Sequence, residues 1–293
     1  MNNLNRKFKN KYKSLVARVW AVLKVTSNRR VEIPILCYHS INDLNSFEAD
    51  PLSSALFTSH LDYLSRNCNV ISLYQALKFI EAGSCPIENP VVITFDDGYK
   101  DNYEVAFPIL KKFQLPATIF AVTGFIDKRV VLIDDNDFGP LTWEQIIEMD
   151  ENQLITFGAH TDTHKLLSRI SDSDARDEIV RSKEVLEDRL GHKVDLFAYP
   201  NGQLIDIPDS SRDVLEDNNF LCACSTLWRS SHKYDEKWMI NRIMISGDDT
   251  LEVLKYKVNG FFDYIYYLHW TKFLLIKLVW LVSRRGSSNI YGK

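Results

Sequence analysis

The sequence is short of the features that mark several protein classes. Its five cysteines are an odd number spread over 293 residues, which does not fit a small disulfide-stapled secreted domain. The 11 glycines and 9 prolines are too few for a collagen-like or Pro/Gly-rich disordered chain. A hydrophobic content of 45% excludes wholesale disorder. These absences leave a globular protein, long enough for one large domain or two small ones.

Both ends of the chain lack acidic residues. Residues 1–30 carry nine basic residues and residues 264–293 carry five, with no acid in either segment. All 39 acidic residues therefore lie in 31–263, where the remaining 21 basic residues leave a net charge of −18. An acidic surface repels phosphate, so we exclude nucleic acid as the partner of this central region.

The N-terminal segment, 1–30, has no uninterrupted apolar run. Arg18 and Lys24 break the run at 15–25, and no small-residue cleavage site follows, so we predict no cleaved signal peptide. Spaced as a helix, the apolar residues form one face opposite a Lys/Arg face, which is typical of a helix on an anionic bilayer. The alternative is a solvated basic tail.

The C-terminal segment, 261–293, combines aromatic residues with a leucine-rich stretch. Lys272 and Lys277 fall inside that stretch, which disfavours a clean transmembrane span. We predict an aromatic and basic helix associated with the membrane interface. The alternative is an amphipathic helix that packs on the domain.

Between the ends, short β-branched runs alternate with helical patterns. The predicted strands are 33–38, 91–95, 117–122, 154–158, 196–199, 220–225 and 240–246, and the predicted helices are 55–66, 73–82, 103–113, 143–149 and 174–190. Such alternation predicts an α/β fold with a parallel sheet, open or closed into a barrel, in one domain over 31–260. In these folds, functional groups gather where the strands end.

Two adjacent carboxylates, Asp96 and Asp97, follow the predicted strand 91–95 directly. Neighbouring side chains of an extended chain point apart, so the two acids can occupy different positions. Their charges repel each other and raise one pKa unless a cation lies beside them. The pair therefore indicates a cation site, although an Asp-Asp-Gly sequence is also a common turn.

Two histidines, His160 and His164, follow the predicted strand 154–158. The i, i+4 spacing places both on one face of a helix, which is a common metal-ligand arrangement. Two histidines and one aspartate form a ligand set with open positions, suited to zinc-dependent hydrolysis or to non-haem Fe(II) chemistry. A second, unliganded carboxylate is what a metallohydrolase needs as a general base.

These clusters, taken in order along the chain, resemble the motifs of the polysaccharide deacetylases, carbohydrate esterase family 4. The resemblance rests on TFDDG at 94–98, HTDTH at 160–164 and FAYPNG at 197–202, and it extends to 35–40, 116–120 and 241–243. It covers 33–250. It implies a distorted (β/α) barrel of about seven parallel strands and metal-dependent removal of acetyl groups from glycans.

The resemblance also implies roles for individual residues. Asp97, His160 and His164 match the family's metal ligands, and Asp96 matches the base that deprotonates the metal-bound water. The metal would polarise the acetamide carbonyl, assisted by the backbone N–H of Tyr199. Zinc is the expected metal, with nickel, cobalt or iron as alternatives.

The chain departs from the family pattern in two places. Many members have arginine where Ala198 stands, and we predict that Arg242, at the end of a late strand, supplies the missing cation beside Asp96. The family's late Leu-x-x-His motif, which provides the general acid, is not evident. The Tyr38-His39 pair resembles the poly-N-acetylglucosamine deacetylase subfamily, and that resemblance implies His39 as the general acid.

We therefore predict a hydrolase that removes N-acetyl groups from an N-acetylhexosamine glycan, either a polysaccharide or a lipid-linked precursor. One alternative is a non-catalytic descendant that binds glycan or membrane, and another uses Fe(II) and O₂. The expected partners are the N-acetylated glycan and a membrane surface. We expect the cytoplasmic face of the inner membrane, with the periplasm or cell envelope as the alternative.

Overall fold

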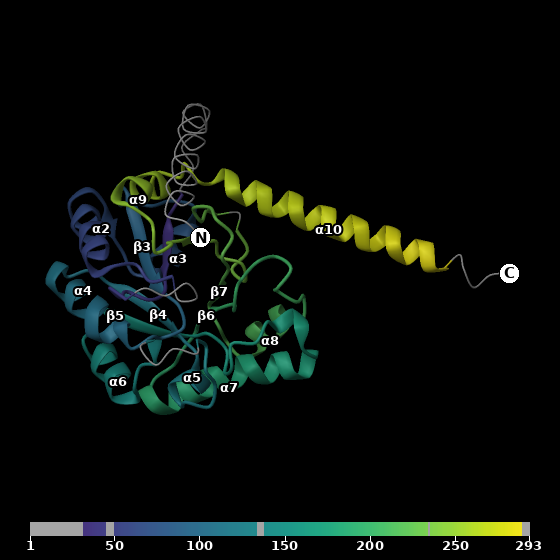
Figure 1. The fold of residues 1–293 in the computed structure, drawn as a ribbon, viewed down its shortest axis with the longest axis horizontal. Helices are drawn as coiled ribbons and strands as arrows, with labels where there is room; N and C mark the ends of the chain where they lie inside the picture. Colours follow the sequence, from purple (N-terminus) through teal and green to yellow (C-terminus); the bar gives the residue numbers. More distant parts are fainter. Residues whose placement is uncertain (1–31, 45–49, 134–137, 234, 289–293) are drawn as a thin grey trace.

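The computed structural model describes residues 32–44, 50–133, 138–233 and 235–288. A curled sheet runs through the middle of the body, and helices cover its outside (Figure 1). The predicted N-terminal helix within 1–30 lies outside the described residues.

The sheet is parallel, and seven strands follow one another across it. Their order is β7 (Cys222–Cys224), β6 (Leu196–Ala198), β5 (Ile155–Ala159), β4 (Ala117–Ala121), β3 (Pro90–Phe95), β1 (Ile35–Tyr38) and β8 (Ile243–Met244). The short β2 (Asn69–Val70) pairs with β3 off this path. The two edges approach each other, because Ile240, just before β8, forms a parallel bridge with Cys224 of β7. The predicted fold class, α/β with a distorted barrel, is confirmed.

Alternation along the strands divides the core into two layers. In β3, Ile93 and Phe95 belong to the larger apolar cluster, whereas Val92 belongs to a second cluster. That second cluster includes Leu73 and Ile80 of α3 (Leu73–Ala82) together with Val92. Because side chains alternate with a period of two, Thr94 and Asp96 continue the face of Val92 into the interior of the curled sheet.

The main helices lie where the sequence predicts them. They are α2 (Ser54–Asn67), α3, α4 (Phe107–Phe113), α6 (Trp143–Glu151) and α7 (Asp172–Leu190). The predicted helix 103–113 begins as a π-helix over Asn102–Ala106 and continues as α4, which has a proline in its first turn. Sequence patterns missed β2, α5 (Thr123–Ile126), α8 (Ser211–Asp217) and α9 (Leu251–Val258), since these elements are too short for a clear period.

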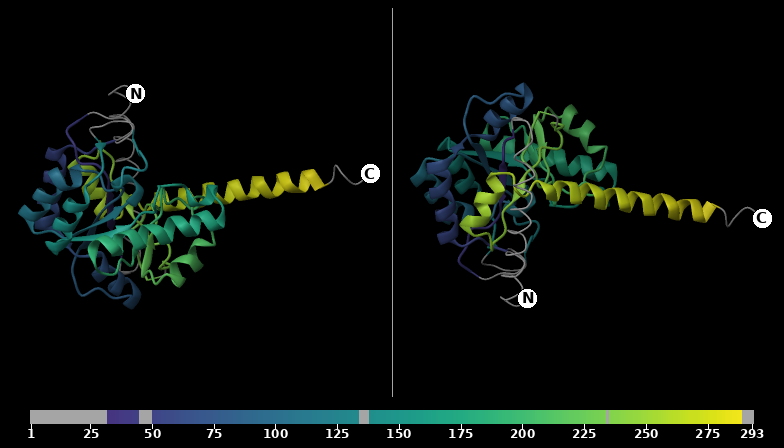
Figure 2. Two further views of the ribbon diagram at one scale, coloured as in Figure 1. Left: turned by 90° about the horizontal axis from the view of Figure 1, so that it is seen from below. Right: turned by 90° about the horizontal axis from the view of Figure 1, so that it is seen from above.

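The last helix, α10 (Tyr264–Ser288), extends outward from the body (Figures 1 and 2). Its apolar side chains Tyr267, Leu268, Leu274 and Leu275 are 55–61% exposed. The predicted C-terminal helix therefore forms. Its first residues, Tyr264 and Ile265, pack against the body, and most of the apolar side chains that follow are exposed. Among the described residues, no helix is long and apolar enough to cross a membrane.

Gly158 in β5 is required by close packing inside the sheet. A Cβ atom there would lie 2.6 Å from the Phe120 ring and 2.9 Å from the carbonyl oxygen of Leu196.

We predict that Gly158→Ala lowers the free energy of unfolding by about 1–3 kcal/mol, because neither neighbour can move freely. Urea denaturation measures the change. The control is Gly191→Asn, at a helix end with open space around it but with a φ of 72°. Asparagine tolerates this left-handed conformation better than other side chains, so a loss below about 1 kcal/mol is expected. Equal stability of Gly158→Ala and the parent would contradict this account.

Candidate active site

The chemically active side chains come from segments next to the strand ends. His39 follows β1, Asp96 and Asp97 follow β3, and His160 follows β5. The sequence predicted Arg242 at the end of a late strand, but Arg242 immediately precedes β8. Its long side chain nevertheless reaches Asp96.

Asp97, His160 and His164 bring three possible ligand atoms together. The Oδ1 atom of Asp97 lies 3.4 Å from Nε2 of His164 and 3.6 Å from Nε2 of His160. This oxygen is buried and has no hydrogen-bond partner. A buried carboxylate oxygen without a donor is costly unless a cation binds it. One carboxylate and two imidazoles with this spacing fit a divalent metal.

The histidine pair does not lie on a helix, so that expectation is wrong. Residues 160–164 form a loop in which Thr161 and His164 adopt positive φ values of 65° and 58°. The backbone amide of His164 donates to Oγ1 of Thr161 at 3.0 Å. A tight turn therefore brings both imidazoles to Asp97.

The same loop is fixed from outside by Asp162. Its carboxylate accepts hydrogen bonds from Thr123 Oγ1 at 2.6 Å and from two nitrogens of Arg129 at 2.5 and 2.8 Å. Asp162 is not part of the Asp97 cluster, and its hydrogen bonds hold the loop in place.

His160 is oriented by a carbonyl group. Its Nδ1 donates to the backbone oxygen of Ala198 at 2.8 Å, because a carbonyl can only accept. The lone pair of Nε2 therefore points to the cluster, as a metal ligand requires. Burial lowers the pKa of His160 to about 4, which keeps the ring neutral at pH 7.

Asp96 has a different environment from its neighbour. Its two oxygens accept hydrogen bonds from the two terminal nitrogens of Arg242 at 2.6 and 2.7 Å, and both side chains are almost fully buried. The Cys37 thiol donates to Oδ2 of Asp96 at 3.3 Å. Burial alone would raise the pKa of Asp96, but the Arg242 guanidinium outweighs it and holds the pKa well below its usual range. The predicted position of Arg242 beside Asp96 is confirmed.

His39 lies on the same cavity as the two aspartates and the two histidines. The cavity has a volume of about 230 Å³, and the side chain of Asn102 donates to the His39 carbonyl at 2.8 Å. The structure thus brings together every predicted site residue except Tyr199. The lining also contains Asn201, Gln203, Thr226 and Met244, which sequence reasoning missed.

The backbone amide of Tyr199 donates to the carbonyl of Cys224 at 3.0 Å. It continues the hydrogen-bond ladder between β6 and β7, and its side chain is buried. The prediction that this amide is free to bind an oxyanion is therefore wrong. Asn201, two residues later and with a φ of 59°, lies on the cavity instead.

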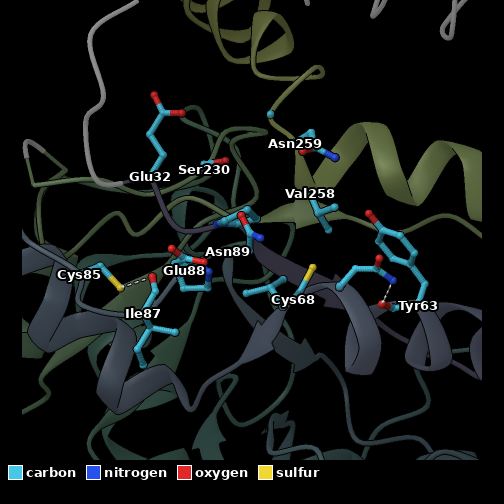
Figure 3. Close-up of a pocket in the computed structure, with 15 residues that line it drawn as sticks. Glu32, Tyr63, Cys68, Cys85, Ile87, Glu88, Asn89, Ser230, Val258 and Asn259 are labelled. Atoms are coloured by element: carbon cyan, nitrogen blue, oxygen red, sulfur yellow. Dashed lines mark hydrogen bonds between the residues drawn. The ribbon is translucent and has the colours of Figure 1, made fainter.

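A larger cavity of about 790 Å³ lies at the opposite end of the strands (Figure 3). It is lined by residues at the start of β3, including Pro90, and by the segment after α9. Cys68, Cys85 and Glu88 surround it, but none of the predicted site residues does.

Comparison with known proteins finds similarity to the polysaccharide deacetylases. The sequence profile described as polysaccharide deacetylase matches residues 83–222. YxkH of Bacillus subtilis, named after the same family, is 30% identical over 180 residues, which are 61% of this chain and 60% of that protein. The chain therefore matches less than two thirds of that relative's length. The poly-beta-1,6-N-acetyl-D-glucosamine N-deacetylase of Staphylococcus epidermidis is 28% identical, over 70% of this chain and 71% of that protein.

Solved structures show the same architecture. The Streptococcus pyogenes deacetylase PplD, in complex with acetate, superposes with a TM-score of 0.69 and 26% identity, covering 78% of this chain and 99% of that chain. IcaB from Ammonifex degensii superposes with a TM-score of 0.64 and 25% identity, covering 78% and 97% of the two chains.

The geometry of the Asp97 cluster predicts that one divalent metal binds and stabilises the fold. At a free metal concentration of about 100 times the dissociation constant, the gain in unfolding free energy is about 2.7 kcal/mol. We expect His164→Ala to lose both the bound metal, measured by elemental analysis at one equivalent, and the gain in stability. The control is His192→Ala, since His192 pairs with Asp150 at the surface. Undiminished metal content in His164→Ala would contradict the ligand set.

Proposed function

We propose that the chain, whose residues 83–222 match the polysaccharide deacetylase family, hydrolyses N-acetyl groups of a glycan built from N-acetylhexosamine units. The observation that carries the proposal is the pair of adjacent aspartates. Asp96 is held ionised by Arg242. Asp97 directs an oxygen without a hydrogen-bond partner toward His160 and His164. A hydrolase needs a base beside a metal site, and a glycan-binding descendant without activity needs neither.

The substrate class follows from the relatives. The Staphylococcus epidermidis protein is named for poly-β-1,6-N-acetylglucosamine, and the match covers most of both chains. We propose a polymer of N-acetylhexosamine or its lipid-linked precursor.

Asp97, His160 and His164 would hold the metal, with zinc favoured by two imidazoles and one carboxylate. Nickel, cobalt and iron fit the same ligands. When bound, such a metal supplies a Lewis acid that polarises the acetamide carbonyl and acidifies a water molecule.

Asp96 is assigned as the general base. Its Oδ2 lies 3.9 Å from Nε2 of His160, so the carboxylate borders the metal ligands. Arg242 fixes both oxygens and keeps the group ionised, ready to accept a proton. A carboxylate with a depressed pKa is a weak base, so the proposed role depends on a bound metal that would acidify the water molecule.

His39 is assigned as the general acid to the leaving amine, because it lines the cavity with Asp96 and carries no role in the metal cluster. Since the Tyr199 amide is bonded within the sheet, we assign the oxyanion contact to the backbone at Asn201, on the turn after β6.

The two assignments predict different responses to the leaving group. Asp96→Asn should lower kcat at least ~100-fold on both an N-acetylglucosamine oligomer and an activated aryl acetate, because both reactions need a base. His39→Ala should lose activity on the oligomer but retain most of it on the aryl acetate, whose leaving group needs no proton. Acetate or phenol release measures each rate.

Asp150→Asn is the matched control, since Asp150 pairs with His192 and neither residue lines the cavity. Metal content measured in parallel separates loss of the base from loss of the metal. An Asp96→Asn enzyme with normal turnover would exclude the base assignment, and equal losses of His39→Ala on both substrates would exclude the acid assignment.

We also propose that the protein works at an anionic membrane surface, on the cytoplasmic face. Support comes from α10, which extends from the body and has exposed apolar residues and no acidic residue. The five cysteines are all free, which fits a reducing compartment.

Vesicle sedimentation tests this proposal with the full chain. We expect binding to vesicles with anionic lipid, weakened by salt, and we expect Leu274→Glu with Leu275→Glu to reduce it, because both side chains are exposed on α10. The control replaces Ile205 and Leu221, which are similarly exposed on the body, with glutamate. If both double variants bind as the parent does, α10 is not the attachment site.

A further inference from the structure

A second group of potential ligands lies beside the metal cluster. It consists of Cys37, His39 and Asp96, and one ligand atom from each lies within 4.8 Å of the others. We propose that these three residues form a second, inhibitory site for a thiophilic divalent cation. The binding rests on this geometry alone, whereas the inhibition rests on the function proposed above.

The geometry between sulfur and oxygen suits a bound cation. Sγ of Cys37 lies 3.3 Å from Oδ2 of Asp96, and the thiol hydrogen is directed to that oxygen. A zinc ion with bonds of about 2.3 Å to sulfur and about 2.1 Å to oxygen spans this separation with an angle of roughly 100° at the metal, close to tetrahedral. The cation takes the place of the thiol proton, which is released to solvent.

The third ligand and the route of entry come from the cavity. His39 and Asp96 line the cavity, and Cys37 lies fully buried behind them. A cation that enters the cavity meets the imidazole and the carboxylate first, and the thiolate then completes three protein ligands.

The two sites differ in the chemistry of their donors. Asp97, His160 and His164 offer nitrogen and oxygen only, whereas the second group contains sulfur. Thiolate ligands favour borderline or soft cations such as cobalt, zinc and cadmium over the hard cations magnesium and calcium. A spectroscopic signal from a sulfur–metal bond therefore reports the second site alone.

The second site must be the weaker one. Arg242 already contacts both oxygens of Asp96, and its positive charge opposes an added cation. We expect the second site to fill only after the first. When it fills, the proposed base and the proposed acid are both ligands, so neither can transfer a proton and turnover stops.

Cobalt titration of the full chain tests the proposal. The first equivalent should bind without a near-ultraviolet thiolate-to-cobalt charge-transfer band, and the band should appear as the second equivalent binds. Cys37→Ser should abolish the band. His39→Gln, at a half-buried position, should shift its half-saturation to cobalt concentrations ~10-fold higher or more, because one ligand is lost.

The matched controls are Cys68→Ser and Cys85→Ser, which remove the two half-buried thiols and should keep the band. A band that persists in Cys37→Ser, or that His39→Gln leaves unchanged, overturns the proposal. So does its absence from parent protein that already holds one cobalt ion. Acetate release measured in the same titration should fall as the band grows. A protein that forms the band but never releases acetate would refute the proposed function and leave the site intact.

Discussion

The buried ion pair between Arg242 and Asp96 is the interaction on which the site depends. A carboxylate that is 2% exposed cannot stay ionised without a partner, and leaving such a charge unpaired costs about 3–5 kcal/mol. Arg242 meets this requirement with two short hydrogen bonds, while its Nε donates to the carbonyl of Ser225. The same side chain lies over the ring of Phe120. One residue therefore keeps the proposed base charged and joins β3 to the closing edge of the sheet.

Two adjacent aspartates can differ this much because the backbone changes direction between them. Asp96 continues the inward face of β3, where it meets Arg242. Asp97 has a φ of 75°, which takes it out of the strand and turns it to His160 and His164. The repulsion expected between neighbouring carboxylates is relieved separately: a guanidinium compensates one, and a divalent cation suits the other.

Local patterns in the sequence were enough for most of the strands, the main helices and the Asp97 cluster, because each motif follows a strand directly. The position of Arg242 could also be predicted. Alanine stands at position 198, where many family members have an arginine, so another residue had to supply the cation beside Asp96. The predictions that were wrong concern features that depend on pairing between distant segments. Only the β6–β7 ladder shows that the Tyr199 amide is occupied, and only the fold around Asp162 shows that the histidine loop is a turn and not a helix. No sequence pattern assigns a role to Cys37, because its contact partner Asp96 lies 59 positions away in the sequence.

Strand register explains how residues outside the segment that matches the family profile reach the site. The family profile ends at residue 222 and begins at 83, so neither His39 nor Arg242 lies within it. Both reach Asp96 because β1 is placed between β3 and β8, with Cys37 opposite Thr94 and Leu36 opposite Ile243. A slip of one residue in β1 would turn the Cys37 thiol to the opposite face of the sheet. The proposed metal ligands are encoded in two short loops, whereas the groups that would move protons, and the thiol beside them, are brought together by the pairing of β1 with both β3 and β8.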